Sequence, residues 1–420
     1  MLANFKAINF TRENLVYLLV LLFPVLGVSV RHWNSGLFVL VCLFSLVCLK
    51  KRDILNLPLR LKLLSAFFIA YSILGIYTSS QYGFDEFVKN NYLEEDVRFL
   101  LLAPLLLLFG RHRASKEYLY LGILAANFIA LIHALIDRFY FGYEFAGGVY
   151  GYGYFGGVTA ITSCFALAGL LNYTKFEHVK IKKSIVVASY LAGFVACMLS
   201  ISQVSMLILT VLSFLIVYKA VKRKAYYVYS LILFLTIFFI FLGSSELMRA
   251  RLLRTFDVSA VESYIKSEDK SKIKIHSSLI ERLEMWRATL IISKNNQYSG
   301  VGAGKYYVYI NKLASDNIIN PFVATHGHPH NIFMESLVTR GFLGVILLLA
   351  IFVILFDNCK KKNGNNIWRQ HLLLHILAIL IIGSFESAPV NKGNFVAIFL
   401  IYIAAFSSKD EKSISRESIV

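Results

Sequence analysis

About twelve apolar segments are candidates to cross a lipid bilayer, and they constrain the fold of this chain more than any other feature. The composition agrees, because 57% of the 420 residues are apolar, 16% are charged and the mean hydropathy is +0.63. Inside a bilayer, backbone polar groups must be satisfied within the chain, so such segments are helical. We expect spans near residues 15–30, 36–49, 61–78, 98–110, 118–137, 146–172, 184–201, 203–218, 226–243, 342–357, 370–384 and 394–407. The pattern predicts an all-α, polytopic integral membrane protein.

The net charge of +18 would suit a nucleic-acid-binding protein, but the basic residues are distributed asymmetrically. If residues 1–14 stay inside, 25 of the 43 Lys and Arg residues fall in the inner loops and the termini, and five in the short outer loops. This asymmetry follows the positive-inside rule. The charge therefore sets the orientation in the membrane, and we expect no nucleic-acid partner.

One long polar stretch interrupts the spans. Residues 244–341 form a loop of about 100 residues, which is far longer than an ordinary connection, so we expect it to carry its own structure and the function. The predicted organisation is transmembrane helices 1–9 in residues 1–243, an outside loop in residues 244–341, helices 10–12 in residues 342–407 and an inner tail in residues 408–420.

Two helices are expected inside the loop. The first covers Ser277–Ser293, with a capping box formed by Ser278 and Glu281 and one apolar stripe. The stripe consists of Leu279, Leu283, Trp286 and Leu290. The segment Gly300–Gly304 predicts a turn that brings the backbone close to a partner that the sequence does not identify. A second short helix is expected near residues 331–340 and should end at Gly341.

Three histidines alternate at His326, His328 and His330. A metal site would need further ligands, and the loop offers none at a diagnostic spacing, while the five cysteines of the chain also lack metal-ligand spacing. A purely structural histidine is a second interpretation. The third is catalysis, because a neutral imidazole is the side chain best matched to proton transfer near pH 7. We expect no metal.

His330 is followed by Asn331, nine residues, and then Gly341 and Gly344. This block resembles the His-Asn/Ser/Gln-x9-Gly-x-x-Gly signature of the O-antigen ligases. Those proteins are integral membrane glycosyltransferases that move a finished polysaccharide from a lipid pyrophosphate carrier onto a lipopolysaccharide core sugar. The resemblance implies that His330 is catalytic and that Asn331, Gly341 and Gly344 lie at the substrate site.

Two further segments bear on this resemblance. Arg282 precedes Met285-Trp286 as in a helix of the family, which implies a pyrophosphate contact rather than a solvated arginine. The family's second arginine is replaced by Gln203, which supplies no charge. We expect Arg98 to take over that charge, because its apolar run of about twelve residues is too short to span the bilayer. Snorkelling or an ion pair is the alternative for Arg98.

Together these residues imply a GT-C-like glycosyltransferase of the bacterial inner membrane, with its active site facing the periplasm. The donor would be an O-polysaccharide on undecaprenyl pyrophosphate and the acceptor a hydroxyl of lipid A-core. The resemblance implies no nucleotide, metal or other cofactor, because the lipid pyrophosphate is already an activated leaving group. Membrane lipids are the remaining expected partners.

Other functions remain open. A surface-polysaccharide polymerase or a protein O-oligosaccharyltransferase would use the same donor, although the outer segments lack the Arg-x10-Gly pair that O-antigen polymerases often show. A lipid-linked oligosaccharide flippase would not be an enzyme, and it would have little use for a long outside loop with a His-Asn block.

The charge asymmetry makes a testable topology prediction. Residue 300 should lie outside the inner membrane, and residues 115, 181, 223 and 361 should lie inside. Single cysteines at these positions, treated with a membrane-impermeant thiol reagent, would check it. Labelling of residue 300 only after the inner membrane is permeabilised would contradict the predicted architecture.

Overall fold

A computed structural model describes most of the chain. The described residues are 11–31, 33–47, 55, 57–81, 92–112, 114–170, 179–220, 246, 249–250, 253, 257–275, 277–294, 296–360 and 367–408. They form helices and turns and contain no strand, which confirms the all-α prediction. The expected span at residues 226–243 and the tail beyond residue 408 lie outside the described residues.

Seven helices in the described residues are long and apolar enough to cross a membrane. They are α1 (Arg12–Ser29), α4 (Leu59–Ser80), α8 (Ser115–Leu135) with its π-helical continuation Ile136–Tyr140, α9 (Tyr152–Leu170), α10 (Lys183–Ser200), α17 (Ile332–Cys359) and α18 (Ile367–Phe385). Shorter apolar helices are α2 (Trp33–Val47), α11 (Gln203–Ala220) and α20 (Gly393–Ser407). The chain is a multi-pass membrane protein.

The expected span at residues 98–110 is instead two helices, α6 (Tyr92–Leu100) and α7 (Leu102–Arg111). Leu101 between them has non-helical dihedral angles (φ −88°, ψ 3°). Pro104 accounts for the break, because it has no N–H to donate to the carbonyl of Leu100 and its ring would clash with that carbonyl in a continuous helix.

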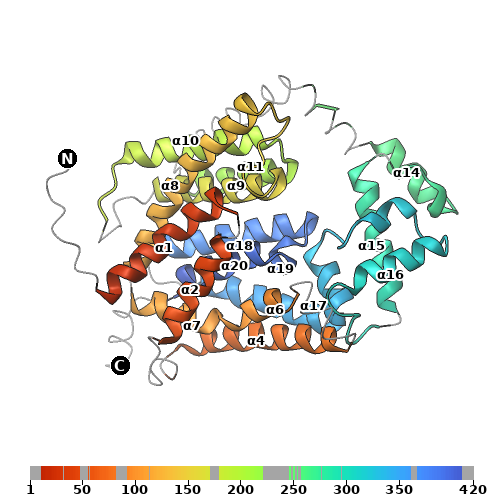
Figure 1. Cartoon of the computed structure of the whole chain (residues 1–420), viewed down its shortest axis with the longest axis horizontal. Helices are drawn as coiled ribbons and strands as arrows, with labels where there is room; N and C mark the ends of the chain where they lie inside the picture. Colours follow the sequence, from red (N-terminus) through yellow and green to blue (C-terminus); the bar gives the residue numbers. More distant parts are fainter. Residues whose placement is uncertain are drawn as a thin grey trace.

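The apolar helix α20 lies at the centre of the membrane part. Every residue from Phe395 to Phe406 is at most 3% exposed. A helix that is apolar on all sides must be surrounded by other elements. It packs against α2, α6, α7 and α18, between the group α8–α11 and the pair α4 and α17 (Figure 1).

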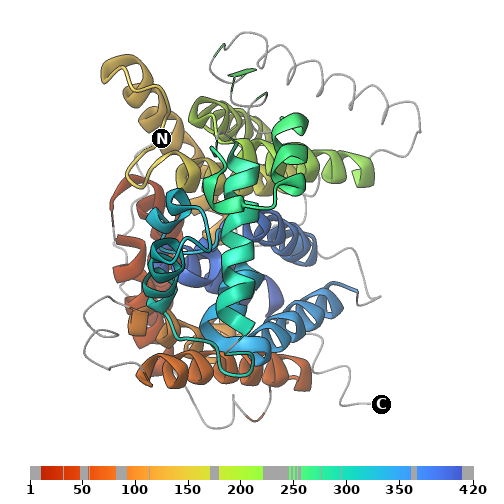
Figure 2. The same cartoon turned by 90° about the vertical axis from the view of Figure 1, so that its right-hand side faces the viewer.

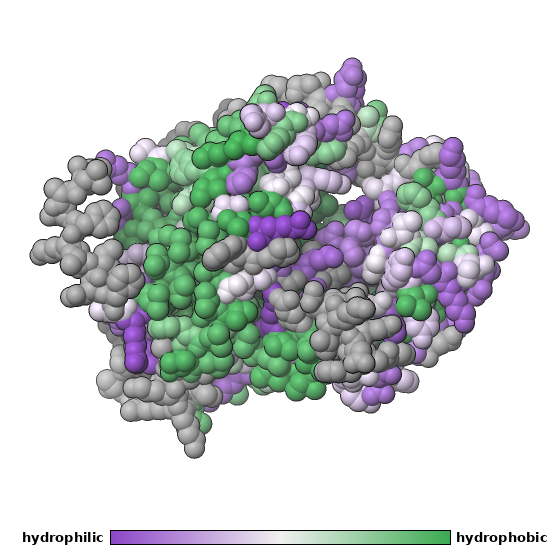
Figure 3. Space-filling view, in the orientation of Figure 1, coloured by the Kyte–Doolittle hydropathy of each residue, from purple (hydrophilic) through white to green (hydrophobic). Residues whose placement is uncertain are grey.

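A polar unit, which we call the cap (residues 257–331), stands at one end of the membrane helices (Figures 1 and 2). Its helices are α14 (Val258–Lys266), α15 (Ser278–Lys294) and α16 (Lys305–Ser315), with 3-10 turns at Lys270–Lys272 and Pro321–Thr325. Hydrophobic residues cover the surface of the membrane part, and hydrophilic residues gather over the cap (Figure 3). This contrast in surface hydropathy is expected if lipid surrounds the membrane part and water surrounds the cap.

The α15 helix forms where expected, but two details of the prediction were wrong. Ser277 is the residue that caps it, since its Oγ accepts from the backbone N–H of Leu279 at 3.2 Å, and Glu281 pairs with His326 instead of closing a capping box. The buried face differs from the expected apolar stripe, in which Leu290 is 54% exposed. The buried residues of α15 are Ile280, Glu284, Met285, Ala288, Thr289, Ile292 and Ser293.

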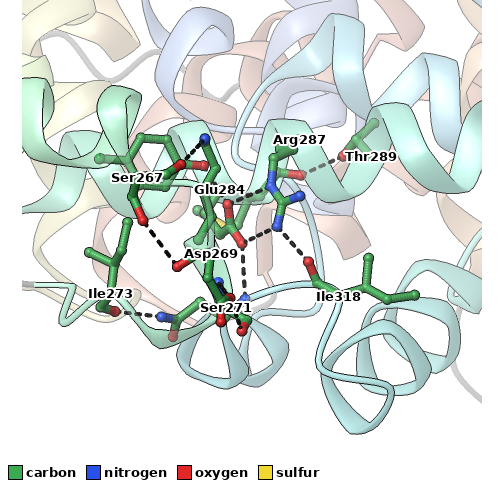
Figure 4. Close-up of polar contacts among 12 residues, drawn as sticks. Ser267, Asp269, Ser271, Ile273, Glu284, Arg287, Thr289 and Ile318 are labelled. Carbon is green, nitrogen blue, oxygen red and sulfur yellow. Dashed lines mark hydrogen bonds and ion pairs between the residues drawn. The ribbon is translucent and has the colours of Figure 1, made fainter.

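A buried carboxylate organises this part of the cap (Figure 4). Glu284 on α15 is fully buried and accepts two hydrogen bonds from Arg287, at 2.9 and 3.0 Å. It also accepts from the backbone N–H of Asn320 at 2.9 Å and from the Tyr264 hydroxyl. Burial alone would raise the pKa of Glu284, but these partners lower it. The carboxylate therefore stays charged and ties α14 and the segment before Pro321 to α15.

The cap docks on a break in α17. Gly341 has φ 66° and ψ −168°, and the backbone N–H of Phe342 donates to the Gln297 carbonyl at 2.8 Å instead of continuing the helix. The Val338 carbonyl, which Phe342 would otherwise use, accepts from the N–H of Val301 at 2.7 Å. Residues 297–302, which include the start of the glycine turn, thus exchange backbone hydrogen bonds with the end of the short helix, so both predicted features meet at one junction.

A buried ion pair also holds the end of the short helix, on the side of the membrane helices. Arg340 on α17 contacts the carboxylate of Asp96 on α6, and both side chains are at most 4% exposed. The guanidinium carbon of Arg340 also lies 4.4 Å from the ring centroid of Tyr71 on α4. Removing one partner of such a pair leaves an uncompensated charge, so these contacts hold three helices together beneath the cap.

A substitution at the junction tests its role. Gly341→Ala should lower the stability of the folded protein by about 1–3 kcal/mol, because its backbone conformation is nearly restricted to glycine. The added Cβ would also lie 2.3 Å from the Tyr298 carbonyl oxygen. Thermal unfolding of purified protein in detergent measures the change. Gly327→Ala is the control, since a Cβ there meets nothing within 4 Å, and equal midpoints for the two variants would contradict the account.

Candidate active site

A cavity of about 670 Å³ lies between the cap and the membrane helices. This volume is within the range of small-molecule sites. Its lining comes from the starts of α9, α11, α15 and α20, the end of α18, and the loop before α17. The lining residues are Tyr150, Tyr152, Gly153, Tyr154, Gly157, Ile201, Ser202, Gln203, Val204, Ser205, Ile275, Ser277, Ser278, Glu281, Arg282, Phe322, His328, His330, Ile382, Phe385, Glu386, Lys392, Asn394 and Phe395.

Four of these elements present their N-terminal turns to the cavity: α9, α11, α15 and α20. The first N–H groups of a helix have no partner within the helix, and the helix dipole adds positive partial charge at that end. Two cationic side chains, Arg282 and Lys392, join them in the lining. These groups give part of the lining a positive charge, beside the carboxylates of Glu281 and Glu386.

His330 lies in a strained turn at the cavity wall. Its φ is 52°, in the left-handed region that residues other than glycine rarely adopt. The neighbours hold this turn: the indole N–H of Trp286 donates to the Pro329 carbonyl at 3.0 Å, and Asn331 caps α17. Strain of this kind persists only where the surroundings impose it, and it is concentrated at functional sites.

Glu386 is the partner of His330. Its Oε2 lies 3.1 Å from the His330 Nδ1, and its Oε1 accepts from the backbone N–H of Ser387 at 2.9 Å. Burial alone would raise the pKa of Glu386, but the hydrogen bond and charge of His330 and the charge of His328 lower it to about 2. A charged Glu386 that accepts from Nδ1–H leaves Nε2 of His330 as the basic nitrogen.

The other two histidines have different surroundings. His326 pairs with Glu281. His328 lies with its Nδ1 3.6 Å from Oε1 of Glu386, and burial lowers the pKa of His328 to about 4. The ligand atoms of His328, His330 and Glu386 all lie within 4.8 Å of one another, a geometry that could hold a metal ion. The third ligand of this group was missing from the sequence interpretation.

Arg282 on α15 and Gln203 on α11 both line the cavity. Arg282 donates from Nη1 to the Ser278 carbonyl at 3.1 Å and from Nε to the Phe385 carbonyl at 3.4 Å. These bonds aim its guanidinium along the start of α15. Gln203 is the first residue of α11.

Four predicted substrate-binding residues are absent from the lining. Asn331 uses its side chain on Phe333 N, Met334 N and the Ser384 carbonyl, so it caps a helix. Gly341 forms the junction with the cap, and Gly344 packs against Arg340, whose Cβ would lie 2.4 Å from an added Cβ. Arg98 is 3% exposed, with its guanidinium 5.8 Å from the Phe38 ring centroid. The motif positions other than His330 shape the protein around the site.

Two residues of the cavity lining were not identified as site residues by the sequence analysis. Glu386 and Lys392 lie in the short segment between α18 and α20, which is far from the His330 block in the chain. A glutamate and a lysine between two apolar helices were a signal, because charges at such positions need a partner or water.

The low pKa of Glu386 predicts a pH dependence. A carboxylate whose folded pKa is about 2, against an ordinary 4.5, contributes stability that is present above pH 4.5 and is lost as the pH falls toward 2. Glu386→Gln should therefore unfold at a lower temperature than wild type at pH 6, and the gap should narrow by pH 3. Glu262→Gln, at an exposed pair with Lys266, is the control. A gap that stays constant with pH would contradict the assignment.

Two comparisons show what the chain is similar to. An uncharacterized protein of Haemophilus influenzae (strain ATCC 51907 / DSM 11121 / KW20 / Rd) is 25% identical over 317 residues, which cover 72% of this chain and 76% of that protein. The family model described as O-antigen ligase matches residues 188–349, a stretch that contains Gln203, Arg282 and the His330 block. The match supports a ligase- or polymerase-type function. Residues 188–349 of the chain are therefore similar to the O-antigen ligase family of membrane proteins.

Proposed function

We propose that the protein is an O-antigen ligase of the bacterial inner membrane, with its cavity open to the periplasm. It transfers O-polysaccharide from undecaprenyl pyrophosphate to a sugar hydroxyl of lipid A-core. The observation that carries the proposal is the His330–Glu386 pair in a cavity that also collects two cations and four helix N-termini. A base and an anion site are the two elements that this reaction needs.

In the proposed reaction the acceptor hydroxyl oxygen attacks the anomeric carbon of the donor glycan. The bond from that carbon to the phosphate oxygen breaks, and undecaprenyl pyrophosphate leaves with the bonding electrons. The Nε2 of His330 takes the acceptor proton, and charged Glu386 stabilises the imidazolium through Nδ1. General-base catalysis of this kind is typically worth about 10²–10⁴ in rate.

The anion site stabilises the charge that develops on the pyrophosphate. Arg282 and Lys392 act in a partly closed cavity, where positive groups aimed at a developing charge are most effective. Gln203 adds a hydrogen-bond donor at the start of α11. We propose Lys392 as the second cation in place of Arg98, because Lys392 lines the cavity and Arg98 does not.

Aromatic side chains provide a surface for sugar. Tyr150, Tyr152 and Tyr154 line the cavity next to the anion site, and the rings of Tyr150 and Tyr154 lie 4.6 Å apart between centroids. Apolar faces of sugar rings stack on such side chains. A donor with its pyrophosphate at Arg282 would extend its first sugars along this wall.

The function itself is tested by deleting the gene and separating the lipopolysaccharide on a gel. Loss of a ligase leaves bare lipid A-core, with the lipid-linked polymer accumulating outside. Core carrying a single repeat would instead identify a polymerase. Single lipid-linked repeats that accumulate on the inner face would identify a flippase. Normal lipopolysaccharide would exclude an O-antigen ligase and point to a protein as the glycan acceptor.

Histidine substitutions test the proposed base. In the deletion strain, His330→Ala should lower ligation about 10²–10⁴-fold with normal protein levels, because the variant lacks the proposed base. His326→Ala and His328→Ala should keep substantial activity, and a chelator should leave the purified enzyme active. Equal loss in all three variants, together with inactivation by EDTA, would instead support a catalytic metal.

A charge-relocation experiment tests the anion site. Lys392→Ala should lower transfer about 10- to 100-fold, the range expected for one charged hydrogen bond. Gln203→Arg should partly restore it by returning a cation to the same cavity. Lys266→Ala, at an exposed residue of the cap, is the control. Full activity of Lys392→Ala would exclude Lys392 from the anion site, and rescue by Gln203→Arg only in Arg98→Ala would assign the second cation to Arg98.

A further inference from the structure

Three side chains of the cavity lining have the composition of a metal site. Two imidazoles and a carboxylate come together from the segment before α17 and the segment after α18. His328 and His330 have their ring centroids 4.2 Å apart, and each Nδ1 faces one oxygen of Glu386. The sequence shows only the two histidines, so the set of three ligands is a product of the fold.

The spacing of these atoms fits a small tetrahedral ion. Ligands at about 2.0–2.1 Å from zinc in a tetrahedral arrangement lie about 3.3 Å from one another. The Nδ1–oxygen distances to Glu386 are 3.1 Å for His330 and 3.6 Å for His328. Shifts of a few tenths of an ångström would place all three ligands around one ion.

We infer that His328, His330 and Glu386 form a binding site for a borderline divalent transition-metal ion such as Zn²⁺, and that occupation of this site inhibits glycosyl transfer. The binding stands on the geometry alone, whereas the inhibition rests on the proposed function of His330 as the base. No step of the proposed transfer reaction requires this ion.

The ligand types select the ion. Imidazole nitrogen favours zinc, copper, iron and nickel, whereas Mg²⁺ and Ca²⁺ prefer shells of oxygen ligands. Three protein ligands leave a fourth position open, as in zinc sites that exchange their remaining ligand. The side chains are 18%, 21% and 35% exposed for His328, His330 and Glu386 and line the cavity, so an ion can enter from it.

Neighbouring hydrogen bonds support the ligands in this arrangement. The backbone N–H of Ser387 donates to Oε1 of Glu386 at 2.9 Å, and Trp286 holds the carbonyl of Pro329 between the two histidines. Contacts of this kind orient metal ligands, and their loss typically weakens metal binding about 10- to 100-fold.

Inhibition follows from the tautomer of His330. In the transfer reaction Nδ1 carries the proton and Nε2 holds the free electron pair that accepts the acceptor proton. A zinc ion bound at Nδ1 needs a free electron pair on Nδ1, so the single proton of the neutral ring moves to Nε2. The ring then presents an N–H to the acceptor hydroxyl and cannot act as its base.

Zinc binding is measured first, without reference to activity. Purified full-length protein in detergent, stripped of metal, is titrated with Zn²⁺ by calorimetry, and about one equivalent should bind. The dissociation constant should rise at least tenfold in His328→Ala and in Glu386→Gln. His326→Ala should bind as wild type, because that ring pairs with Glu281. Equal binding by wild type and His328→Ala would overturn the site.

Transfer by the same preparations tests the inhibition. Zinc should suppress transfer by wild type, EDTA should restore it, and His328→Ala should be active and at least tenfold less sensitive to zinc. Undiminished wild-type transfer at saturating zinc would overturn the inhibition, as would a requirement for zinc after EDTA treatment. If metal-free wild type transfers nothing at all, the proposed function fails, and the calorimetric result still decides the site.

Discussion

The exchange of backbone hydrogen bonds at Gly341 is the constraint on which the rest of the structure depends. Because the helix breaks there, the Val338 carbonyl is free to accept from Val301 in the cap, and Phe342 donates to the cap in return. The short helix before the break is thereby fixed to both the cap and the membrane helices. His330 lies two residues before the start of that helix at Ile332, so its position against Glu386 depends on the junction.

Electrostatic balance then decides what the cavity can do. Each carboxylate of the lining faces a histidine, Glu281 with His326 and Glu386 with His330. Arg282 and Lys392, together with the helix N-termini, are left to act on a ligand. An arrangement of this kind suits the proposed anionic donor, because the proposed base keeps its own carboxylate partner. The same histidine–carboxylate geometry also makes the site sensitive to a transition-metal ion.

The sequence predicted the features that depend on local pattern. The apolar runs predicted membrane helices, and the helix of Arg282, the glycine turn and the end of the short helix at Gly341 occur where expected. Three features could not be predicted from the sequence. Pro104 divided an expected span, the buried face of α15 was set by a charged network around Glu284, and Glu386 reaches His330 across 56 positions of the chain. Each depends on contacts between distant segments, which periodicity and spacing do not encode.

The motif also looks different in three dimensions. Asn331, Gly341 and Gly344 hold the shape around the site, and among the motif positions His330 reaches the cavity. The most direct test of the central claim is transfer by the purified protein in liposomes that contain lipid-linked O-polysaccharide and lipid A-core, with chelator and without nucleotide. The account predicts core-linked polymer and an equal amount of released undecaprenyl pyrophosphate in wild type. No product, or product that forms only when a nucleotide sugar is added, would contradict it.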